Sequence, residues 1–293
     1  MKSGFVSIIG RPNVGKSTLL NAILDKKITI TSNKPQTTRN NIQGIYNKDD
    51  YQIVFVDTPG IHKPKSKMGK YLNKQAYFST EDVNVILLLV DVNESLGKGD
   101  KFVIETLKNI KTPVILVLNK IDKISKEKLL PIIENYMSLY HFEEIIPISA
   151  LTKDNVNRLL EIIKKYINDQ IRYYDNDQIT NVSREFVITE FIREKVFNLT
   201  NEEVPYSVAC VIEHIEEEKE KIVIYANIIV DRDNLKKIII GQKGTMIKEI
   251  GIKARKDIEA YLDKKVYLNL FVKTIKDWRE KDSYLKEFGI KFE

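Results

Sequence analysis

The sequence predicts an α/β domain with a doubly wound, mostly parallel β-sheet, followed by a smaller α+β domain. Over about the first 165 residues, short apolar runs alternate with segments of helical periodicity, which is typical of such a sheet. A polar stretch, RYYDNDQITN, then interrupts the alternation. After it the expected order of elements becomes α-β-β-α-α-β. We therefore expect a first domain at residues 1–172, a linker at 173–182 and a second domain at 183–293.

Length and composition restrict the class of protein. At 293 residues the chain is long enough for two domains that each bury a core. Cys210 is the only cysteine, which excludes an intrachain disulfide and is typical of a reducing, cytoplasmic setting. The apolar runs are far shorter than the roughly 18 residues that cross a bilayer, and the N-terminus shows no signal-peptide pattern. With no coiled-coil heptad in the sequence, we expect a cytoplasmic monomer.

Five apolar runs are the expected strands of the first domain. They lie at residues 5–9, 52–57, 85–91, 114–119 and 144–149. Their continuous apolar character is typical of strands buried on both faces of a parallel sheet. Because ligands of such sheets bind beyond the carboxyl ends of the strands, the segments that follow these runs are the expected site.

The segment after the first run reads GRPNVGKS and matches the phosphate loop G-x-x-x-x-G-K-[ST]. In such a loop, backbone N–H groups and the N-terminus of the following helix face the phosphates. Lys16 is expected to reach the β- and γ-phosphates, and the Ser17 hydroxyl to bind Mg²⁺. The other expected nucleotide contacts in this segment are Gly10, Asn13, Val14, Gly15 and Thr18.

Two later segments predict that the base is guanine. The carboxylate of Asp122, in the sequence NKID, can accept hydrogen bonds from N1–H and the exocyclic amine of guanine, a donor pair that adenine lacks. The lysine of NKID would lie along the base, and the SAL segment could donate a backbone N–H to guanine O6. Each segment is a weak signal alone, but their order and their place at strand ends reinforce each other. The expected guanine-binding residues are Asn119, Lys120, Asp122, Ser149, Ala150 and Leu151.

The sequence also contains two expected switch segments, KPQTTR and VDTPG. A threonine in the first would close the shell of Mg²⁺ and sense the γ-phosphate, and Thr38 is favoured over Thr37. In the second, Asp57 would hold Mg²⁺ through water and the Gly60 N–H would contact the γ-phosphate, so that loss of this phosphate releases both loops. The expected metal ligands are Ser17, Thr38 and Asp57.

Together, GRPNVGKS, QTTR, DTPG, NKID and SAL resemble the Era family of bacterial GTPases, within the translation-factor class of P-loop GTPases. The similarity continues beyond the linker, through EFVITEFIREKVFNLTNEEVPYSVACVIEHIEE and IIIGQKGTMIKEIG, and so covers nearly the whole chain. The resemblance implies a GTPase that binds the 3′ end of small-subunit ribosomal RNA and assists maturation of the small ribosomal subunit. It also implies loose attachment to the inner face of the cell membrane.

Ile61 stands where many GTP-hydrolysing switches have the glutamine that orients the attacking water. In related GTPases an asparagine at the position of Asn13 helps to coordinate K⁺ beside the phosphates, where a fixed cation offsets transition-state charge. The alternative is that Asn13 only caps the loop. Backbone of the 34–39 segment or a bound partner could hold the water instead, so we expect slow unaided hydrolysis. The residues expected to act in hydrolysis are Lys16, Asn13, Thr38 and Gly60.

The second half has the element order of a type II KH domain, with the loop GQKG between two helices. In this fold a GxxG loop clamps the backbone of single-stranded nucleic acid, because glycine leaves no side chain in the way. The loop alone is a weak signal, since a helix C-cap followed by a turn also produces it. Trp278 is read as a packing residue rather than a base-stacking platform.

The distribution of charge supports RNA binding by the second half. The net charge is +6, and from residue 232 to 281 basic residues outnumber acidic ones, whereas the opposite holds from 184 to 220. A solvated lysine-rich face gives the same composition. The alternative function is a GTP-regulated scaffold that docks proteins or a membrane through this basic domain. The expected RNA contacts are Lys236, Lys237, Gly241, Gln242, Lys243, Gly244, Lys248, Lys253 and Arg255.

Overall fold

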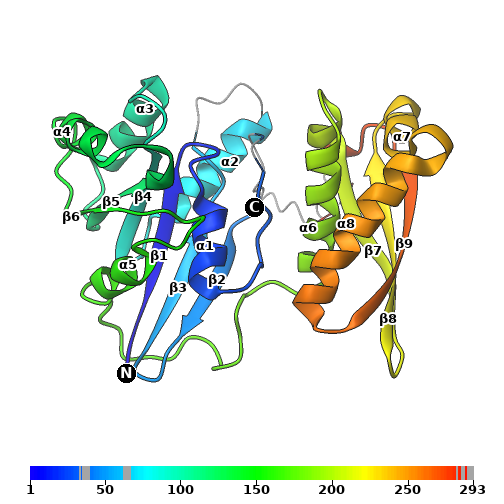
Figure 1. Ribbon diagram of the computed structural model, residues 1–293, viewed down its shortest axis with the longest axis horizontal. Helices are drawn as coiled ribbons and strands as arrows, with labels where there is room; N and C mark the ends of the chain where they lie inside the picture. The colour runs from blue at the N-terminus through cyan, green and yellow to red at the C-terminus, as the bar shows by residue number, and fades with distance from the viewer. Residues whose placement is uncertain (33, 35–39, 62–66, 282, 285–287, 289–293) are drawn as a thin grey trace. The chain divides into compact units, whose positions relative to one another are not determined.

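The computed structural model describes residues 1–32, 34, 40–61, 67–281, 283–284 and 288 (Figure 1). The chain divides into two compact units, Met1–Asn181 and Val182–Glu293. No described helix is both long enough and apolar enough to cross a membrane.

The first unit is built around a six-stranded sheet with the strand order β2-β3-β1-β4-β5-β6 (Figure 1). All neighbouring strands are parallel except β2 and β3, which are antiparallel. The predicted mostly parallel sheet is therefore confirmed. The strands are β1 (Lys2–Gly10), β2 (Ile42–Asn47), β3 (Tyr51–Asp57), β4 (Val85–Asp91), β5 (Val114–Asn119) and β6 (Glu144–Pro147).

Helices cover both faces of this sheet, which explains why β4 and β5 are buried along their whole length. Figure 1 shows α1 and α5 over one face. On the other face, α2, α3 and α4 supply Ala76, Ile104 and Tyr136 to a core that also contains Leu88 and Leu116 of the strands. The helices are α1 (Lys16–Leu24), α2 (Lys67–Phe78), α3 (Lys98–Leu107), α4 (Leu129–Met137) and α5 (Val156–Ile163).

Strand β2, with the sequence IQGIYN, was not predicted from the sequence. It forms a hairpin with β3 across a short turn in which the Lys48 N–H donates to the Tyr51 carbonyl over 2.9 Å. Its isoleucines Ile42 and Ile45 are buried, whereas its glutamine is not. Six residues with one glycine and mixed polarity give too weak a pattern for a strand, so its hydrogen bonds to β3 decide its structure.

Most of the predicted linker, residues 173–181, is packed against the edge strand β2. The Ile45 N–H donates to the Ile179 carbonyl over 2.9 Å, and the Thr180 hydroxyl donates to the Gln43 carbonyl over 2.8 Å. This segment covers backbone groups of β2 that an edge strand otherwise leaves unpaired. It belongs to the first unit, whose last residue is Asn181.

The second unit has a three-stranded sheet of order β7-β8-β9, with β7 and β8 antiparallel and β8 and β9 parallel. Helices α6 and α8 lie side by side over the sheet (Figure 1). The predicted order α-β-β-α-α-β is confirmed. The elements are α6 (Arg184–Leu199), β7 (Val208–Glu217), β8 (Lys221–Val230), α7 (Asp233–Ile240), α8 (Thr245–Leu262) and β9 (Lys265–Thr274).

Local sequence explains how this unit begins and ends. Ser183 caps α6, because its hydroxyl oxygen accepts a hydrogen bond of 3.2 Å from the Phe186 N–H. Near the other end, Trp278 is buried and makes an edge-to-face contact with Phe288, with ring centroids 5.4 Å apart. That burial agrees with the packing role expected for the only tryptophan.

Candidate nucleotide and nucleic-acid sites

The described motifs of the first unit meet at one edge of its sheet. The phosphate loop follows β1, the VDTPG segment ends β3, NKID follows β5, and SAL follows β6. Because β1, β3, β5 and β6 are parallel, these segments lie at the same edge, as the sequence predicted. Thr37, Thr38 and most of the first switch segment lie outside the described residues.

The phosphate loop is closed around the side chain of Lys16. Its buried ammonium donates to the carbonyls of Gly10 and Arg11 over 3.2 and 2.9 Å. Burial lowers the pKa of Lys16 to about 8, and the nearby Asp57 carboxylate acts in the opposite direction. Within the described part of the chain, the ammonium lacks a negatively charged partner apart from the nearby Asp57. A bound phosphate would supply that negative charge, for which the neutral carbonyls are only a partial substitute. Gly15 has a φ of 102°, and a Cβ there would lie 2.3 Å from the Asn119 amide nitrogen.

The residues present fit a magnesium ion. The Ser17 hydroxyl donates to Asp57 Oδ2 over 2.7 Å, and Asp57 is fully buried. Its Oδ1 is buried and has no hydrogen-bond partner among the described residues. Burial raises the pKa of Asp57 to about 6, although Lys16 and Ser17 act in the opposite direction. A hard cation is the partner that such a buried carboxylate oxygen lacks.

The residues after Asp57 lie against the phosphate loop. The Thr58 hydroxyl donates to the Ile8 carbonyl over 2.8 Å, and the Ile61 N–H donates to the Gly10 carbonyl over 3.1 Å. A Cβ on Gly60 would lie 2.6 Å from the backbone nitrogen of Pro12. The side chain of Ile61 is buried in the hydrophobic core with residues of β4 and α3. Ile61 therefore packs the fold and does not reach toward a water at the phosphates.

The guanine-binding segments are joined to one another and to the phosphate loop by side-chain hydrogen bonds. The Asn119 side chain accepts from the Ala150 N–H over 2.9 Å and donates to the Val14 carbonyl over 2.7 Å. The Ser149 hydroxyl donates to Asp122 Oδ1 over 2.6 Å, which fixes the carboxylate expected to read the base. The side chain of Leu151 is 73% exposed, so only its backbone can serve the site. The structure thus brings together the expected residues of NKID, SAL and the phosphate loop.

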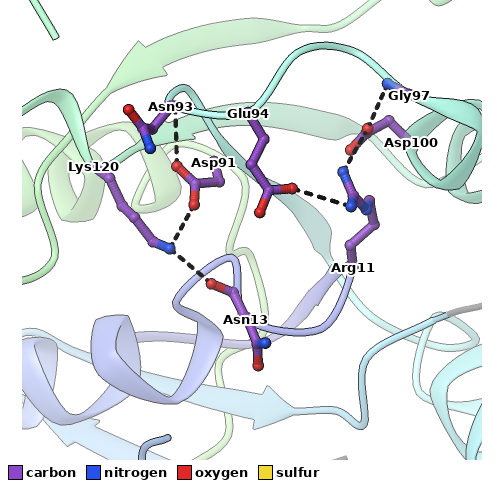
Figure 2. Close-up of polar contacts among 8 residues, drawn as sticks. All are labelled: Arg11, Asn13, Asp91, Asn93, Glu94, Gly97, Asp100 and Lys120. Carbon is purple, nitrogen blue, oxygen red and sulfur yellow. Dashed lines mark hydrogen bonds and ion pairs between the residues drawn. The ribbon is translucent and has the colours of Figure 1, made fainter. Parts of the chain in front are cut away.

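Four charged residues beside the phosphate loop were not predicted from the sequence: Arg11, Asp91, Glu94 and Asp100 (Figure 2). Lys120 Nζ donates to the Asn13 carbonyl over 2.9 Å and pairs with Asp91 over 2.5 Å. Arg11 pairs with Glu94 and Asp100, each over 3.0 Å. Asp91 could have been suspected, because it is a carboxylate at the end of an apolar run, where the site was expected.

In the second unit the GQKG loop, residues 241–244, is a single turn between α7 and α8. Gly241 and Gly244 have φ values of 73° and 78°, and Lys243 has a φ of 52°. These values favour glycine at both ends of the loop. The Lys243 side chain is exposed, and so are most of the other basic side chains predicted to bind RNA: Lys237, Lys248, Lys253 and Arg255; Lys236 is half-buried.

A cleft, called here the GxxG cleft, lies between α8, the helix that follows this loop, and the edge strand β9. Lys248 and Arg255 lie on its helix side, and Tyr267 lies on its strand side. Ile252 is a further apolar lining residue, and like Tyr267 it is more than half exposed. The lysines and the loop were predicted from the sequence, whereas Ile252 and Tyr267 of this apolar lining were not. The signal that could have identified it is a large apolar residue, Tyr267, at a position of β9 whose alternation places it on the solvent side.

Two protein families match the two units. The family described as 50S ribosome-binding GTPase matches residues 5–120, and the KH domain family matches residues 203–279. The second match confirms the KH assignment made from the element order and the GxxG loop.

Two solved structures resemble the whole chain. A point variant of Era from Aquifex aeolicus bound to GDP·AlF4⁻ is 42% identical, with a TM-score of 0.94 and 100% of both chains covered. The structure of Era in complex with MgGDPNP and nucleotides 1506–1542 of 16S ribosomal RNA gives the same identity, TM-score and coverage. With its phosphate loop, its guanine-binding segments and its KH unit, the chain belongs to the Era family of GTPases.

Proposed function

We propose that this GTPase is a switch that binds small-subunit ribosomal RNA near its 3′ end and assists maturation of the small ribosomal subunit. The observation that carries the proposal is the presence, in one chain, of a guanine and phosphate site and a basic GxxG cleft. The Era complexes with MgGDPNP, GDP·AlF4⁻ and 16S ribosomal RNA support it.

Mg²⁺ is the cofactor of this switch. Ser17 and Asp57 would hold it, with Thr38 as the third expected ligand, and its charge would offset that of the β- and γ-phosphates. Lys16 binds the same phosphates, and the Gly60 N–H contacts the γ-phosphate. GTP thereby orders both switch segments and hydrolysis releases them. Because Ile61 is buried in the core, no side chain at that position orients water, and unaided hydrolysis is slow.

K⁺ is a second ion proposed for the site, with Asn13 as its ligand. Asn13 is exposed and has a φ of 67°, a left-handed backbone conformation that asparagine tolerates. A cation there would offset charge that develops in the transition state. We expect Asn13→Ala to remove stimulation of hydrolysis by K⁺ while GDP affinity stays within about threefold. If K⁺ still stimulates this variant as in the unchanged protein, Asn13 only caps the loop.

The setting proposed for this activity is the cytoplasm, with a monomeric chain that attaches loosely to the cytoplasmic face of the cell membrane. The single cysteine and the basic excess of the second half support it. Sedimentation of the purified chain with vesicles of anionic lipid, compared with neutral lipid, tests the attachment. Equal recovery with both vesicles would contradict it.

The decisive experiment measures RNA affinity in two nucleotide states. The full chain is titrated, at one fixed salt concentration, onto a labelled oligonucleotide of the small-subunit rRNA 3′ end with Mg²⁺ and either GDP or a non-hydrolysable GTP analogue. A scrambled oligonucleotide of equal length is the control. Tighter binding of the native sequence with the analogue supports the switch. Weak binding in both states, with protein partners retained after nuclease treatment, would favour the scaffold that docks proteins or membrane.

A further inference from the structure

One side of the phosphate loop is joined to the start of α3 through Arg11. Arg11 Nη1 lies 3.0 Å from Asp100 Oδ2, and Nη2 lies 3.0 Å from Glu94 Oε2 (Figure 2). Asp100 is 6% exposed and also accepts a hydrogen bond of 2.9 Å from the Gly97 N–H, which caps α3. A buried carboxylate that is already fixed to the backbone of a helix end is a rigid anchor for a guanidinium.

The other side of the loop is joined to the end of β4 through Lys120. Lys120 Nζ lies between the Asn13 carbonyl, at 2.9 Å, and Asp91 Oδ2, at 2.5 Å (Figure 2). Asp91 is itself oriented, because its Oδ1 accepts a hydrogen bond of 3.0 Å from the Asn93 N–H. The lysine expected to lie along the base is thus held by a carboxylate outside the guanine-binding segments.

All three carboxylates belong to one short segment, residues 91–100, which runs from the last residue of β4 into the first turn of α3. We infer that this segment is a clamp that holds the phosphate loop at Arg11 and at Asn13, and that Arg11 and Asp91 are the positioning residues through which it slows nucleotide release. The inference deepens the proposed function, because it assumes only that the site binds guanine nucleotide. Neither residue needs to touch the nucleotide.

The physical reason is pre-organisation. The loop binds phosphate with backbone N–H groups, and these bind well only while the loop keeps one conformation. Residues 10 and 11 also supply the carbonyls that hold Lys16. A loop that is fixed at both sides loses less entropy when the nucleotide binds, and its opening requires the two ion pairs of Arg11 and the hydrogen bond from Lys120 to Asn13 to break. Loss of the contacts on either side should therefore speed dissociation.

Gly99 provides a test that removes no charge. A Cβ on Gly99 would lie 2.8 Å from Arg11 Nε and 3.0 Å from Arg11 Cδ, so Gly99→Ala should push the guanidinium away from its carboxylates. Gly99 lies in the first turn of α3, where alanine is the better helix former. A purely structural role for this contact predicts a more stable protein with unchanged nucleotide release. The clamp predicts faster release.

The experiment measures dissociation of a fluorescent N-methylanthraniloyl-GDP from the full chain with Mg²⁺, after addition of excess GDP. We expect the rate to rise about tenfold for Arg11→Met and for Asp91→Asn, and about threefold for Gly99→Ala and for Glu94→Gln, whose carboxylate is half exposed. Arg11→Lys, which can reach one carboxylate at a time, should lie between Arg11→Met and the unchanged protein. Glu105→Gln is the matched control, because its pair with Lys108 lies on α3 away from the loop.

The outcomes separate the clamp from the proposed function. If the unchanged protein does not bind the GDP analogue, the proposed function and the clamp both fall. If it binds, but Glu94→Gln, Gly99→Ala and Asp91→Asn release it at rates within twofold of the control, the clamp alone is overturned. These variants keep Arg11, so a folding defect of Arg11→Met does not decide the result. Thermal unfolding without nucleotide shows whether stability and release change independently, as the clamp requires.

Discussion

The nucleotide site of the first unit and the GxxG cleft of the second bind their ligands with different kinds of surface. In the first, Lys16, Asp57, Asn119 and Ser149 are buried, and each is hydrogen-bonded to backbone or to another side chain of the site. In the second, the expected contacts are mostly exposed basic side chains, together with the backbone of the GQKG loop, which includes the exposed Lys243. The first surface can discriminate between chemical groups, because a wrong ligand leaves buried polar atoms unpaired. The second attracts the phosphate backbone of RNA by its positive charge, so selection between RNA sequences depends on the apolar lining of the cleft.

The largest effect is expected at the base-reading carboxylate. Asp122→Asn keeps the size of the side chain but loses the charge that guanine N1–H and the amine require, so GDP affinity should fall by about 10³-fold or more. Calorimetric titration with GDP measures the change. Leu151→Ala is the control. Because the side chain of Leu151 is exposed and only its backbone is expected to serve the site, the GDP affinity of this variant should be unchanged. An Asp122→Asn protein that binds GDP normally would show that this carboxylate does not read the base.

The next effect is expected at Asp57, where function and stability should change in opposite directions. Asp57→Asn removes the charged ligand of Mg²⁺, so Mg²⁺-supported GDP affinity should fall on the order of 100-fold. In protein without metal or nucleotide, the same substitution should raise stability at pH 7. The reason is that Asp57 has a pKa of about 6, above its ordinary 3.8, so the folded state binds the proton more tightly than the unfolded state.

The pH dependence of stability provides a control for the prediction at Asp57. As pH rises from about 4 to 6, an acid with a raised pKa lowers the free energy of unfolding, and above pH 6 the full penalty, on the order of 3 kcal/mol, remains. The gain from Asp57→Asn should therefore be present at pH 7 and disappear near pH 4. Thermal unfolding at both pH values measures it. A gain of equal size at both would mean that packing, not the buried charge, is responsible.

The sequence predicted the parts of the site that are formed by contiguous segments. A phosphate loop, NKID and SAL each fix their backbone within a few residues, and the parallel sheet brings them to one edge. Sequence also predicted that Ile61 cannot hold a water, but its burial between β4 and α3 depends on the tertiary core.

The clamp and the strand side of the GxxG cleft could not be predicted in the same way. Arg11 and Asp100 are 89 residues apart, and Lys120 and Asn13 are 107 apart, so no local pattern links them. Tyr267 follows the ordinary alternation of a strand, and only its edge position beside α8 gives it a role. Strand β2 likewise depends on hydrogen bonds with β3.

The third prediction concerns selection in the second unit. Tyr267 is 56% exposed on the strand side of the cleft, where a base can stack on its ring. Tyr267→Ala should weaken binding of the rRNA oligonucleotide about tenfold, because stacking contributes ~1–3 kcal/mol per base. The dependence of affinity on salt should stay the same, since no charge is lost. Fluorescence anisotropy at several salt concentrations measures both quantities, and a changed salt dependence would contradict a stacking role.

The smallest effect is expected at Lys243, in the middle of the GxxG loop. Lys243→Gln removes one exposed charge from a surface that binds phosphate through several, so RNA affinity should fall only about threefold. The slope of log affinity against log salt should decrease in magnitude by about 0.7, the value for one phosphate contact on a single strand. Lys219→Gln, at another exposed lysine, in the β7–β8 turn, is the matched control and should change neither quantity. Equal losses for the two variants would mean that general charge, rather than the loop, attracts the RNA, and the contrast between the two surfaces would then be sharper than proposed.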